Sequence, residues 1–186
     1  MNTPLKKNFL VVLAILVLVI DSSCKKDDGG TGPTPDPEFP SSSKFAVTLY
    51  TAKSTLSVNE SFDVKAVLYN VTNVFGAALE VGYPSAKIQV LGTTAGTAFF
   101  PAANVLTISQ VEADSQRVGY GVTYKAGTST GSSGSGIVVT FQCKALATGA
   151  VTLTINASKL ELKKSDGNPI TGFSGILKEN LPLTIQ

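Results

Sequence analysis

Histidine and tryptophan are absent from this 186-residue chain, and cysteine occurs only twice. Without histidine there is no Ser-His-Asp triad, no Cys-His dyad and no histidine-rich metal site, so the commonest hydrolase and metalloenzyme designs are excluded. Charged residues make up only 15% of the chain, and 15 Lys and Arg nearly balance 13 Asp and Glu without forming a basic cluster. Nucleic-acid binding through phosphate neutralisation is therefore not expected. The composition favours a non-catalytic binding module with one core.

Residues 1–23 are expected to be a lipoprotein signal peptide. Lys6 and Lys7 precede an unbroken apolar run over residues 9–20. This run is shorter than the ~20 residues of a transmembrane helix and matches the ~7 to 15 residues of a signal-peptide core, so a buried helix is the weaker alternative. The next residues, Asp21-Ser22-Ser23-Cys24, resemble a bacterial lipobox, in which small residues precede the cysteine that is lipidated. Asp21 departs from that pattern, because an aliphatic residue is usual there.

The residues after Cys24 indicate where such a lipoprotein is displayed. Lys25-Lys26-Asp27-Asp28 is similar to the export signals that send lipoproteins of the Bacteroidota type to the outer face of the outer membrane, although a solvated tether explains the charges equally well. Several acyl chains on one cysteine anchor a protein stably without a spanning helix. We therefore expect an outer-membrane lipoprotein that is exposed at the cell surface.

Residues 24–43 are expected to combine the lipidated Cys24 with a linker rich in Pro, Gly and Ser. They show no apolar periodicity, and Pro33-Thr34-Pro35-Asp36-Pro37 favours extended polyproline geometry at ~3.1 Å per residue. Such a linker holds the following domain up to ~60 Å from the lipid surface.

Residues 44–186 carry the pattern of an all-β domain. Short runs in which apolar and polar residues alternate are separated by Gly, Asn, Asp and Pro, and no long window keeps the 3.6-residue period of a helix. A β-sandwich or jelly roll is the most economical architecture. The positions expected to face its core are Phe45, Val47, Leu49, Phe62, Val64, Ala66, Leu68, Leu79, Val81, Tyr83, Leu106, Ile108, Val118, Tyr120, Val122, Tyr124, Ile137, Val139, Phe141, Cys143, Val151, Leu153 and Ile155.

Two loop-like segments could be mistaken for ligand sites. Ser165-Asp166-Gly167-Asn168-Pro169 suits a tight turn with positive φ, and it lacks the spaced acidic ligands and terminal glutamate of a calcium loop. The glycine-rich segment 127–136 lacks the Lys-Ser/Thr pair and the helix that a phosphate-binding loop needs, so a flexible connector is expected. The sequence therefore predicts no metal site and no cofactor.

Candidate catalytic groups are equally sparse. Cys143 falls on an expected core position and is interpreted as a small buried hydrophobic residue. Glu112 and Asp114 would share a strand face, as a glycosidase pair requires, but they are followed by an apparent hairpin connection in which solvated acids are ordinary. We expect no catalytic residue and no enzymatic activity.

Four further stretches of the chain follow one another in a characteristic order: LSVNESFDV (56–64), VTNVFGAALEVGYP (71–84), GIVVTFQCKA (136–145) and GAVTL (149–153). Together, in this order, they resemble a cohesin domain. Cohesins show a polar opening G-D-x-F-x-V, a strand beginning G-A and ending in Tyr, a strand G-x-x-x-x-x-F-x-x-x-A, and a closing strand G-x-x-x-L followed by an Asp-Gly-Asn turn. Asn59-Glu60 and Tyr83-Pro84-Ser85 depart from the usual Gly-Asp or Gly-Glu and Tyr-Asp-Pro.

This resemblance implies a jelly-roll sandwich of about nine strands that binds the dockerin module of another protein through one sheet face, with calcium held by the dockerin. Glu80, Arg117 and Gln142 would make polar contacts, while small residues would leave a flat surface for a helical partner. Alternation independently predicts that the implied contact residues are exposed. They are Ala78, Glu80, Gly82, Arg117, Gly119, Gly121, Thr123, Val138, Thr140 and Gln142.

The expected function is thus that of a lipid-anchored module that captures dockerin-bearing proteins, for example polysaccharide-degrading enzymes. A carbohydrate-binding module of related fold is the alternative, with a polysaccharide as ligand, and an envelope structural or adhesion lipoprotein is the second. Tyr83, Tyr120 and Tyr124 are expected to face inward, so stacking on sugar rings would depend on aromatic residues at the rim. The rim candidates are Tyr50, Tyr69, Phe99 and Phe100.

Overall fold

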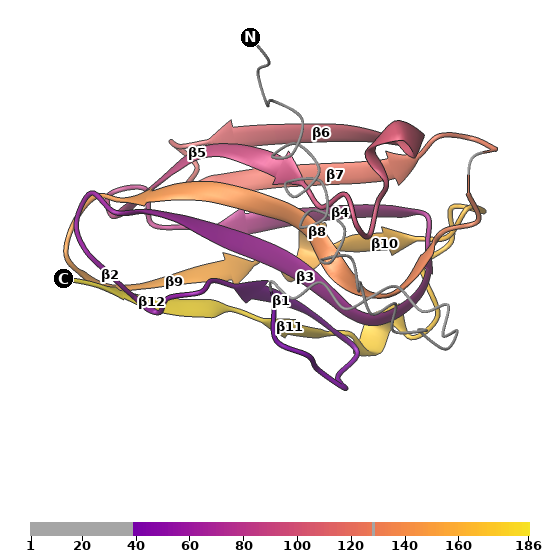
Figure 1. Cartoon of the computed structure of the whole chain (residues 1–186), viewed down its shortest axis with the longest axis horizontal. Helices are drawn as coiled ribbons and strands as arrows, with labels where there is room; N and C mark the ends of the chain where they lie inside the picture. The colour runs from indigo at the N-terminus through magenta and orange to yellow at the C-terminus, as the bar shows by residue number, and fades with distance from the viewer. Residues whose placement is uncertain (1–38, 128) are drawn as a thin grey trace, which may run out of the picture. The chain divides into compact units, whose positions relative to one another are not determined.

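The computed structural model describes residues 39–127 and 129–186. The predicted signal peptide (residues 1–23), the lipidation site Cys24 and the linker up to residue 38 lie outside these residues. Within the described part of the chain, no helix is long and apolar enough to cross a membrane. The described residues form two facing β-sheets (Figure 1).

From β1 to β6 successive strands lie in opposite sheets, as in a jelly roll, and the two-sheet arrangement confirms the predicted all-β sandwich. The first sheet, here named the β3 sheet, has five strands in the order β11-β1-β3-β8-β5. The second, named the β4 sheet, has seven strands in the order β2-β12-β9-β4-β7-β6, with β10 also paired to β4. The bounds are β1 Ala46–Tyr50, β2 Thr55–Leu56, β3 Ser61–Val74, β4 Gly76–Gly82, β5 Ile88–Ala95, β6 Val105–Glu112, β7 Arg117–Tyr124, β8 Ser132–Ala145, β9 Gly149–Ile155, β10 Glu161–Lys163, β11 Leu177–Glu179 and β12 Leu181–Ile185, with short 3₁₀ turns η1 Ala102–Asn104, η2 Ala157–Lys159 and η3 Phe173–Gly175.

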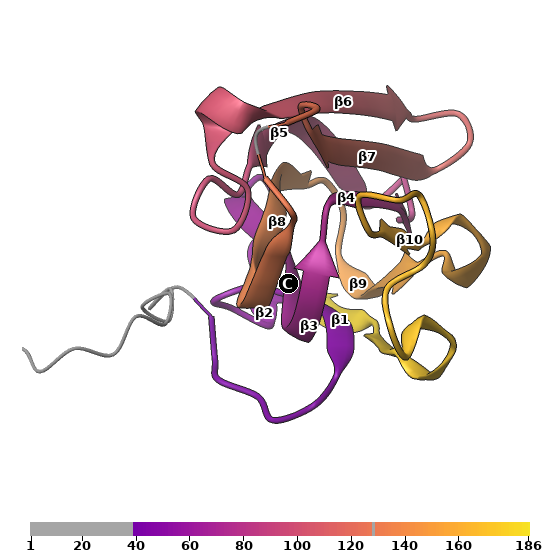
Figure 2. The same ribbon diagram turned by 90° about the vertical axis from the view of Figure 1, so that its right-hand side faces the viewer.

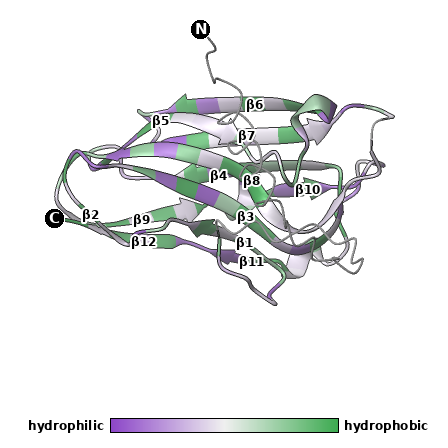
Figure 3. Cartoon of the chain, in the orientation of Figure 1, coloured by the Kyte–Doolittle hydropathy of each residue, from purple (hydrophilic) through white to green (hydrophobic). Residues whose placement is uncertain are grey.

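The core lies between the two sheets and follows the two-residue period of the sequence. Figure 3 shows hydrophobic and hydrophilic residues in alternation along the strands. Val64, Ala66 and Leu68 of β3 are buried in this core, as are the inward tyrosines Tyr83 and Tyr120. Most of the predicted core positions are confirmed, because side chains on successive residues of a strand point to opposite faces of its sheet.

One exception occurs on β8, where Val138 is buried rather than exposed. The pairing between β8 and β3 shifts by one residue at this point: Ala66 pairs with Val139, but the next residue, Val67, pairs with Ile137. The extra residue makes both Val138 and Val139 part of the main core. The prediction of an outward Val138 was therefore wrong. Ile137, predicted to face that core, is buried in a small second cluster with Val67 on the outer side of the β3 sheet.

The second exception is β6, where Leu106 and Ile108 are exposed although they were predicted to face the core. The hairpin pairs Glu112 with Arg117, so even-numbered residues of β6 share a face with odd-numbered residues of β7. The apolar residues of both strands therefore cannot all face inward. The even-numbered residues of β7, which include Tyr120 and Tyr124, occupy the core, and Leu106 and Ile108 point outward.

Two loop predictions have different outcomes. The Asp-Gly turn is confirmed: Lys164 N donates to Asn168 O at 2.8 Å, and Gly167 has a φ of +80°. The glycine-rich segment was predicted to be a connector throughout, but its second half, residues 132–136, begins β8. Gly136 packs so closely on the Phe99 ring that a Cβ there would lie 2.8 Å from the ring.

The start of the described chain contacts the outer side of the β3 sheet. The Phe39 and Tyr69 rings lie 5.6 Å apart, centroid to centroid, in an edge arrangement. Tyr69 Oη donates to Pro40 O at 2.8 Å, and Asn70 Nδ2 donates to Ser42 O at 2.9 Å. Residues 39–43, assigned to the linker from composition, thus bind the sandwich.

Candidate functional site

The outer side of the β4 sheet presents a flat surface over three neighbouring strands, named here the β6–β4 face. The register places Ile108 of β6 opposite Gly121 of β7, and Gly121 opposite Ala78 of β4. The next row contains Gln110, Gly119 and Glu80. The face is defined by Leu106, Ile108, Gln110, Glu112, Arg117, Gly119, Gly121, Thr123, Gly76, Ala78, Glu80 and Gly82.

The sequence-predicted contact residues divide between three places. Those on β4 and β7, which are Ala78, Glu80, Gly82, Arg117, Gly119, Gly121 and Thr123, come together on the β6–β4 face. Thr140 and Gln142 lie on β8 in the β3 sheet, with their side chains on the opposite side of the sandwich. Val138 lies inside the core at 1% exposure. A single contact surface therefore cannot contain all of them.

The sequence-predicted contact residues did not include Gly76, Gln110, Glu112, Leu106 or Ile108 of this face, and the exposed hydrophobic residues among these are Leu106 and Ile108. Their side chains are 59% and 73% exposed, and both are aliphatic. A Cβ at Gly121 would lie 3.1 Å from Ile108 Cγ2, so only glycine lets the isoleucine lie over β7 undisturbed. The pairing of the β6–β7 hairpin could have revealed them. It places Leu106 and Ile108 on the same face as the odd-numbered residues of β7, so they cannot share the core with Tyr120 and Tyr124.

Ile108 separates two shallow hollows. One has a volume of about 510 Å³ and is lined by Leu106, Ile108 and the small residues Gly76, Ala78 and Gly121, among others. The other, of about 260 Å³, lies over Gly119 and Gly121 and is bordered by Glu80 and Gln110. The floor of both hollows consists largely of backbone and small side chains. Such a surface can accept apolar side chains on either side of the Ile108 ridge.

Charged groups form a network at one end of the face. Arg117 Nη2 lies 2.5 Å from Glu112 Oε2, and Arg117 Nε lies 3.8 Å from Glu80 Oε2. Asn156 Nδ2 donates to Glu80 Oε1 at 2.7 Å. The hydrogen bond to Glu112 raises the pKa of Arg117, so this guanidinium keeps its charge.

Glu112 is therefore held in an ion pair with Arg117. Asp114 lies in the turn between β6 and β7, as the sequence predicted. At the other end of the face, Lys163 and Lys164 border the larger hollow together with Glu161. The face thus combines an aliphatic centre with charged ends.

Aromatic residues do not supply a comparable surface. Phe99 and Phe100 are 5% and 0% exposed, and Tyr69 is also buried. Of the rim candidates, only Tyr50 is partly exposed. Among residues 39–127 and 129–186, all the large hydrophobic side chains that are well exposed are aliphatic.

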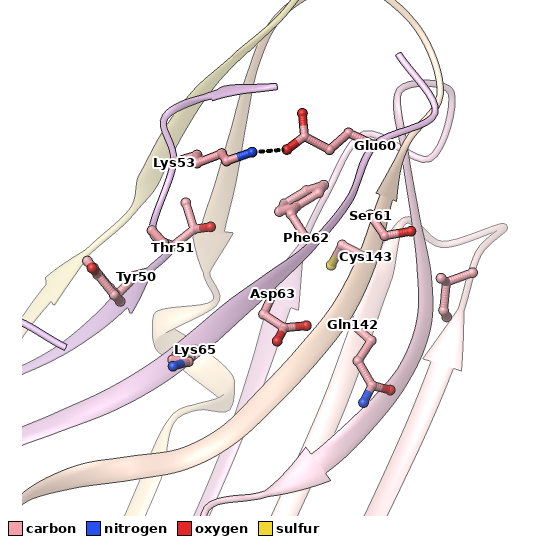
Figure 4. Close-up of a pocket in the computed structure, with 12 residues that line it drawn as sticks. Tyr50, Thr51, Lys53, Glu60, Ser61, Phe62, Asp63, Lys65, Gln142 and Cys143 are labelled. Atoms are coloured by element: carbon pink, nitrogen blue, oxygen red, sulfur yellow. Dashed lines mark hydrogen bonds and ion pairs between the residues drawn. The ribbon is translucent and has the colours of Figure 1, made fainter. Parts of the chain in front are cut away.

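A separate hollow of about 440 Å³ lies at the start of β3, beside the segment that follows β1 (Figure 4). Lys53 Nζ donates to Glu60 Oε1 at 2.6 Å above the Phe62 ring, and this bond lowers the pKa of Glu60. Asp63 of β3 pairs with Gln142 of β8 beside them. This hollow therefore brings an aromatic ring, an ion pair and two polar side chains together.

Cys143 borders the same hollow but is only 1% exposed. Burial raises the pKa of its thiol to about 12, so the thiolate does not form near neutral pH. The predicted burial of Cys143 is confirmed.

Comparisons with known proteins identify the fold independently. The cohesin domain family model matches residues 45–175. A type II cohesin domain from the cellulosome of Acetivibrio cellulolyticus superposes with a TM-score of 0.65 at 18% identity, covering 75% of this chain and 95% of that one. A type II cohesin from the same organism, solved in a complex with an X-dockerin partner, gives a TM-score of 0.65 at 16% identity over 76% and 99% of the two chains.

A third similar structure comes from outside cellulosomes. The non-cellulosomal cohesin of the archaeon Archaeoglobus fulgidus has a TM-score of 0.59 at 20% identity, covering 77% of this chain and 91% of that chain. No curated protein matches the sequence. The family model covers most of the β-sandwich, and the chain therefore belongs to the cohesin family.

Proposed function

We propose that this protein is a non-catalytic cohesin module that binds a dockerin-bearing protein through the β6–β4 face, while a lipid on Cys24 holds it at the cell surface. The exposed aliphatic pair Leu106 and Ile108, on a floor of glycine and alanine, is the observation that carries this proposal. Apolar side chains that protrude over a flat backbone surface are typical anchors of protein interfaces. The small neighbours allow a partner helix to approach the sheet closely.

Similar structures support the choice of partner. One of them was solved as a type II cohesin–X-dockerin complex, and another as a cohesin with a dockerin in a type I interaction, both from Acetivibrio cellulolyticus. The charged ends of the β6–β4 face, with Arg117 and Glu80 at one end and Lys163 and Lys164 at the other, would fix the orientation of the partner. Calcium is expected on the dockerin. Any catalytic activity would belong to the partner, which this module would hold at the cell surface.

The anchor is proposed from the sequence. Residues 1–23 would be removed as a signal peptide, Cys24 would carry the acyl chains, and the Lys25-Lys26-Asp27-Asp28 segment would direct the protein to the outer face of the outer membrane. The cohesin domain would then hold its partner at the cell surface.

Titration calorimetry tests the proposal. The full-length chain in mild detergent is titrated with dockerins from the same organism, once with calcium and once with a chelator. We expect saturable one-to-one binding that requires calcium. Absence of binding to every dockerin in calcium would contradict the proposal.

A polysaccharide is the second candidate ligand, and the hollow at the start of β3 is the observation that favours it. Phe62 and Tyr50 are partly exposed there, with Asp63 and Gln142 beside them as hydrogen-bonding groups. Affinity electrophoresis in gels containing polysaccharide measures this function directly. Retardation that is lost in Asp63→Ala would support the sugar ligand, and unchanged mobility in every gel would exclude it for the polysaccharides used.

A further inference from the structure

Strand β6 is an unprotected edge of the β4 sheet. It is the last strand of that sheet, and among the described residues β7 is its only ladder partner. Figure 2 shows it at the margin of the sandwich, with no strand drawn beyond it. Natural sheets blunt their edges with short strands, bulges, charges or proline, because an exposed edge pairs readily with another chain.

The other sheet edges of the described chain carry such protections. β2 and β11 are only two and three residues long, and β5 has a register shift between Val90 and Gly92. β6 is eight residues long, and its ladder with β7 has no shift. Residues 105–111 also contain no charge, no Pro and no Gly.

The backbone of β6 is open on the side away from β7. Lys125 N donates to Asn104 O at 2.8 Å, one step before β6 begins. Because bonded pairs alternate along an antiparallel ladder, the even-numbered residues of β6 direct their backbone groups toward β7. The N–H and C=O groups of Thr107, Ser109 and Val111 therefore point outward, with nothing in the described chain to pair with them in the ladder.

The side chains of this edge are also unusually apolar for an exposed strand. Leu106, Ile108 and Val111 are all well exposed, Val111 at 42%. A long, flat, uncharged and apolar edge is the feature that sheets normally avoid unless a partner strand covers it.

We propose that β6 pairs antiparallel with β6 of a second copy of this chain, about a two-fold axis at Ile108. Opposite residues in an antiparallel pair lie on the same face of the sheet. Two copies of β6 must therefore align even-numbered residues with even-numbered ones and odd-numbered residues with odd-numbered ones. The register centred on Ile108 aligns Val105 with Val111 and Thr107 with Ser109, and it uses the whole uncharged segment 105–111.

Neighbouring registers are less favourable. Moving the axis to Ser109 places Glu112 opposite Leu106. Moving it to Thr107 limits the pairing within β6 to residues 105–109. The chosen register places Ile108 against its own copy in a non-hydrogen-bonded pair, where side chains approach most closely. Two β4 sheets then form one continuous sheet with closed two-fold symmetry. The proposal rests on the edge of β6 and does not depend on the identity of any dockerin.

A pair of double variants tests the contact through charge. Thr107→Lys with Ser109→Lys places lysines opposite each other across the axis, whereas Thr107→Glu with Ser109→Lys places opposite charges there. Sedimentation velocity of the full-length chain in mild detergent measures the dimer. We expect the wild type and the Glu/Lys variant to dimerise, and the Lys/Lys variant to dissociate with a dimer Kd raised about tenfold or more. Equal behaviour of the two variants, or a wild type that stays monomeric, would overturn the proposal.

Single cysteines test the register independently of the charges. Ile108→Cys is expected to form an intermolecular disulfide under mild oxidation, because the two positions face each other at the axis. Gln110→Cys, on the same strand face but two residues away from the axis, should not cross-link beyond the wild-type level. Thermal unfolding confirms that each variant is folded. Cross-linking at Gln110 without cross-linking at Ile108 would contradict the register.

Discussion

Ile108 is the side chain on which partner binding should depend most. Because it is 73% exposed, Ile108→Asp is expected to leave the free energy of unfolding nearly unchanged. A central apolar anchor replaced by a charge should lower dockerin affinity by about 100-fold. Leu91→Asp is the matched control, since Leu91 is 55% exposed on the β3 sheet. Calorimetry on both variants checks this, and equal losses of affinity would argue against the β6–β4 face.

Arg117 and Glu80 should contribute to affinity more than to stability. Their ion pair lies near the surface, where solvent screens the charges and such a pair adds little to the stability of the fold. Replacing them together as Glu80→Gln and Arg117→Gln is expected to weaken dockerin binding by about tenfold while the midpoint of thermal unfolding changes little. Unchanged affinity in the double variant would remove both residues from the binding site.

Cys143 should be unreactive in the folded protein. Its thiol has a pKa of about 12 in the structure, against about 9 for an ordinary thiol, because burial disfavours the thiolate. The unfolded state therefore loses this proton first, so the contribution of Cys143 to stability is present below pH ~9 and is lost as the pH rises toward 12. A thiol reagent at pH 8 should label this residue only after denaturant is added. Rapid labelling of Cys143 in the native protein would refute the assigned burial.

At the scale of single elements, the close approach of the chain to β8 just after the end of β5 depends on Gly96. A Cβ at this position would lie 1.8 Å from Ile137 O, at the bulge that buries Val138. Gly96→Ala must therefore displace backbone, and we expect it to lower the free energy of unfolding by about 3 kcal/mol or more. Gly119→Ala is the control, because the nearest atom to its Cβ would be 4.0 Å away. Chemical denaturation measures the free energy of unfolding of both variants. A Gly96→Ala protein as stable as the control would contradict the close contact between Gly96 and the Ile137 backbone.

Elements also show where sequence reasoning succeeds and where it stops. The strands, the inward tyrosines and the Asp-Gly turn follow from periodicity and turn chemistry, which are local properties. The buried Val138 depends on a register shift between β3 and β8, and the outward Leu106 and Ile108 depend on which strand of a hairpin occupies the core. Both are decided by pairing between strands, so an alternation pattern read along one strand cannot predict them.

At the scale of the whole molecule, the same limit applies to the binding surface. The resemblance to cohesins placed contact residues on strands that belong to opposite sheets, and only the sheet order separates those on β4 and β7 from Thr140 and Gln142 on β8. The sandwich architecture itself was predictable, because it requires only many short amphipathic strands.

The proposed lipid anchor at Cys24 is tested in cells. If Cys24 carries the lipid, Cys24→Ser should move the protein from the membrane fraction to the soluble fraction, because no acyl chain would remain. Fractionation of cells that express each form, followed by immunoblotting, measures the distribution. A Cys24→Ser protein that stays in the membrane fraction would contradict lipidation as the anchor.

The most direct test of the proposed function is capture of the natural partner. Wild-type chain and the Ile108→Asp variant are immobilised separately and exposed to extracellular proteins of the source organism, with calcium or with a chelator, and the retained proteins are identified by mass spectrometry. We predict that a dockerin-bearing protein is retained by the wild type in calcium, and lost both with chelator and on Ile108→Asp. If no dockerin-bearing protein is retained, or if the variant retains it equally, the assignment of the β6–β4 face as a dockerin-binding surface is wrong.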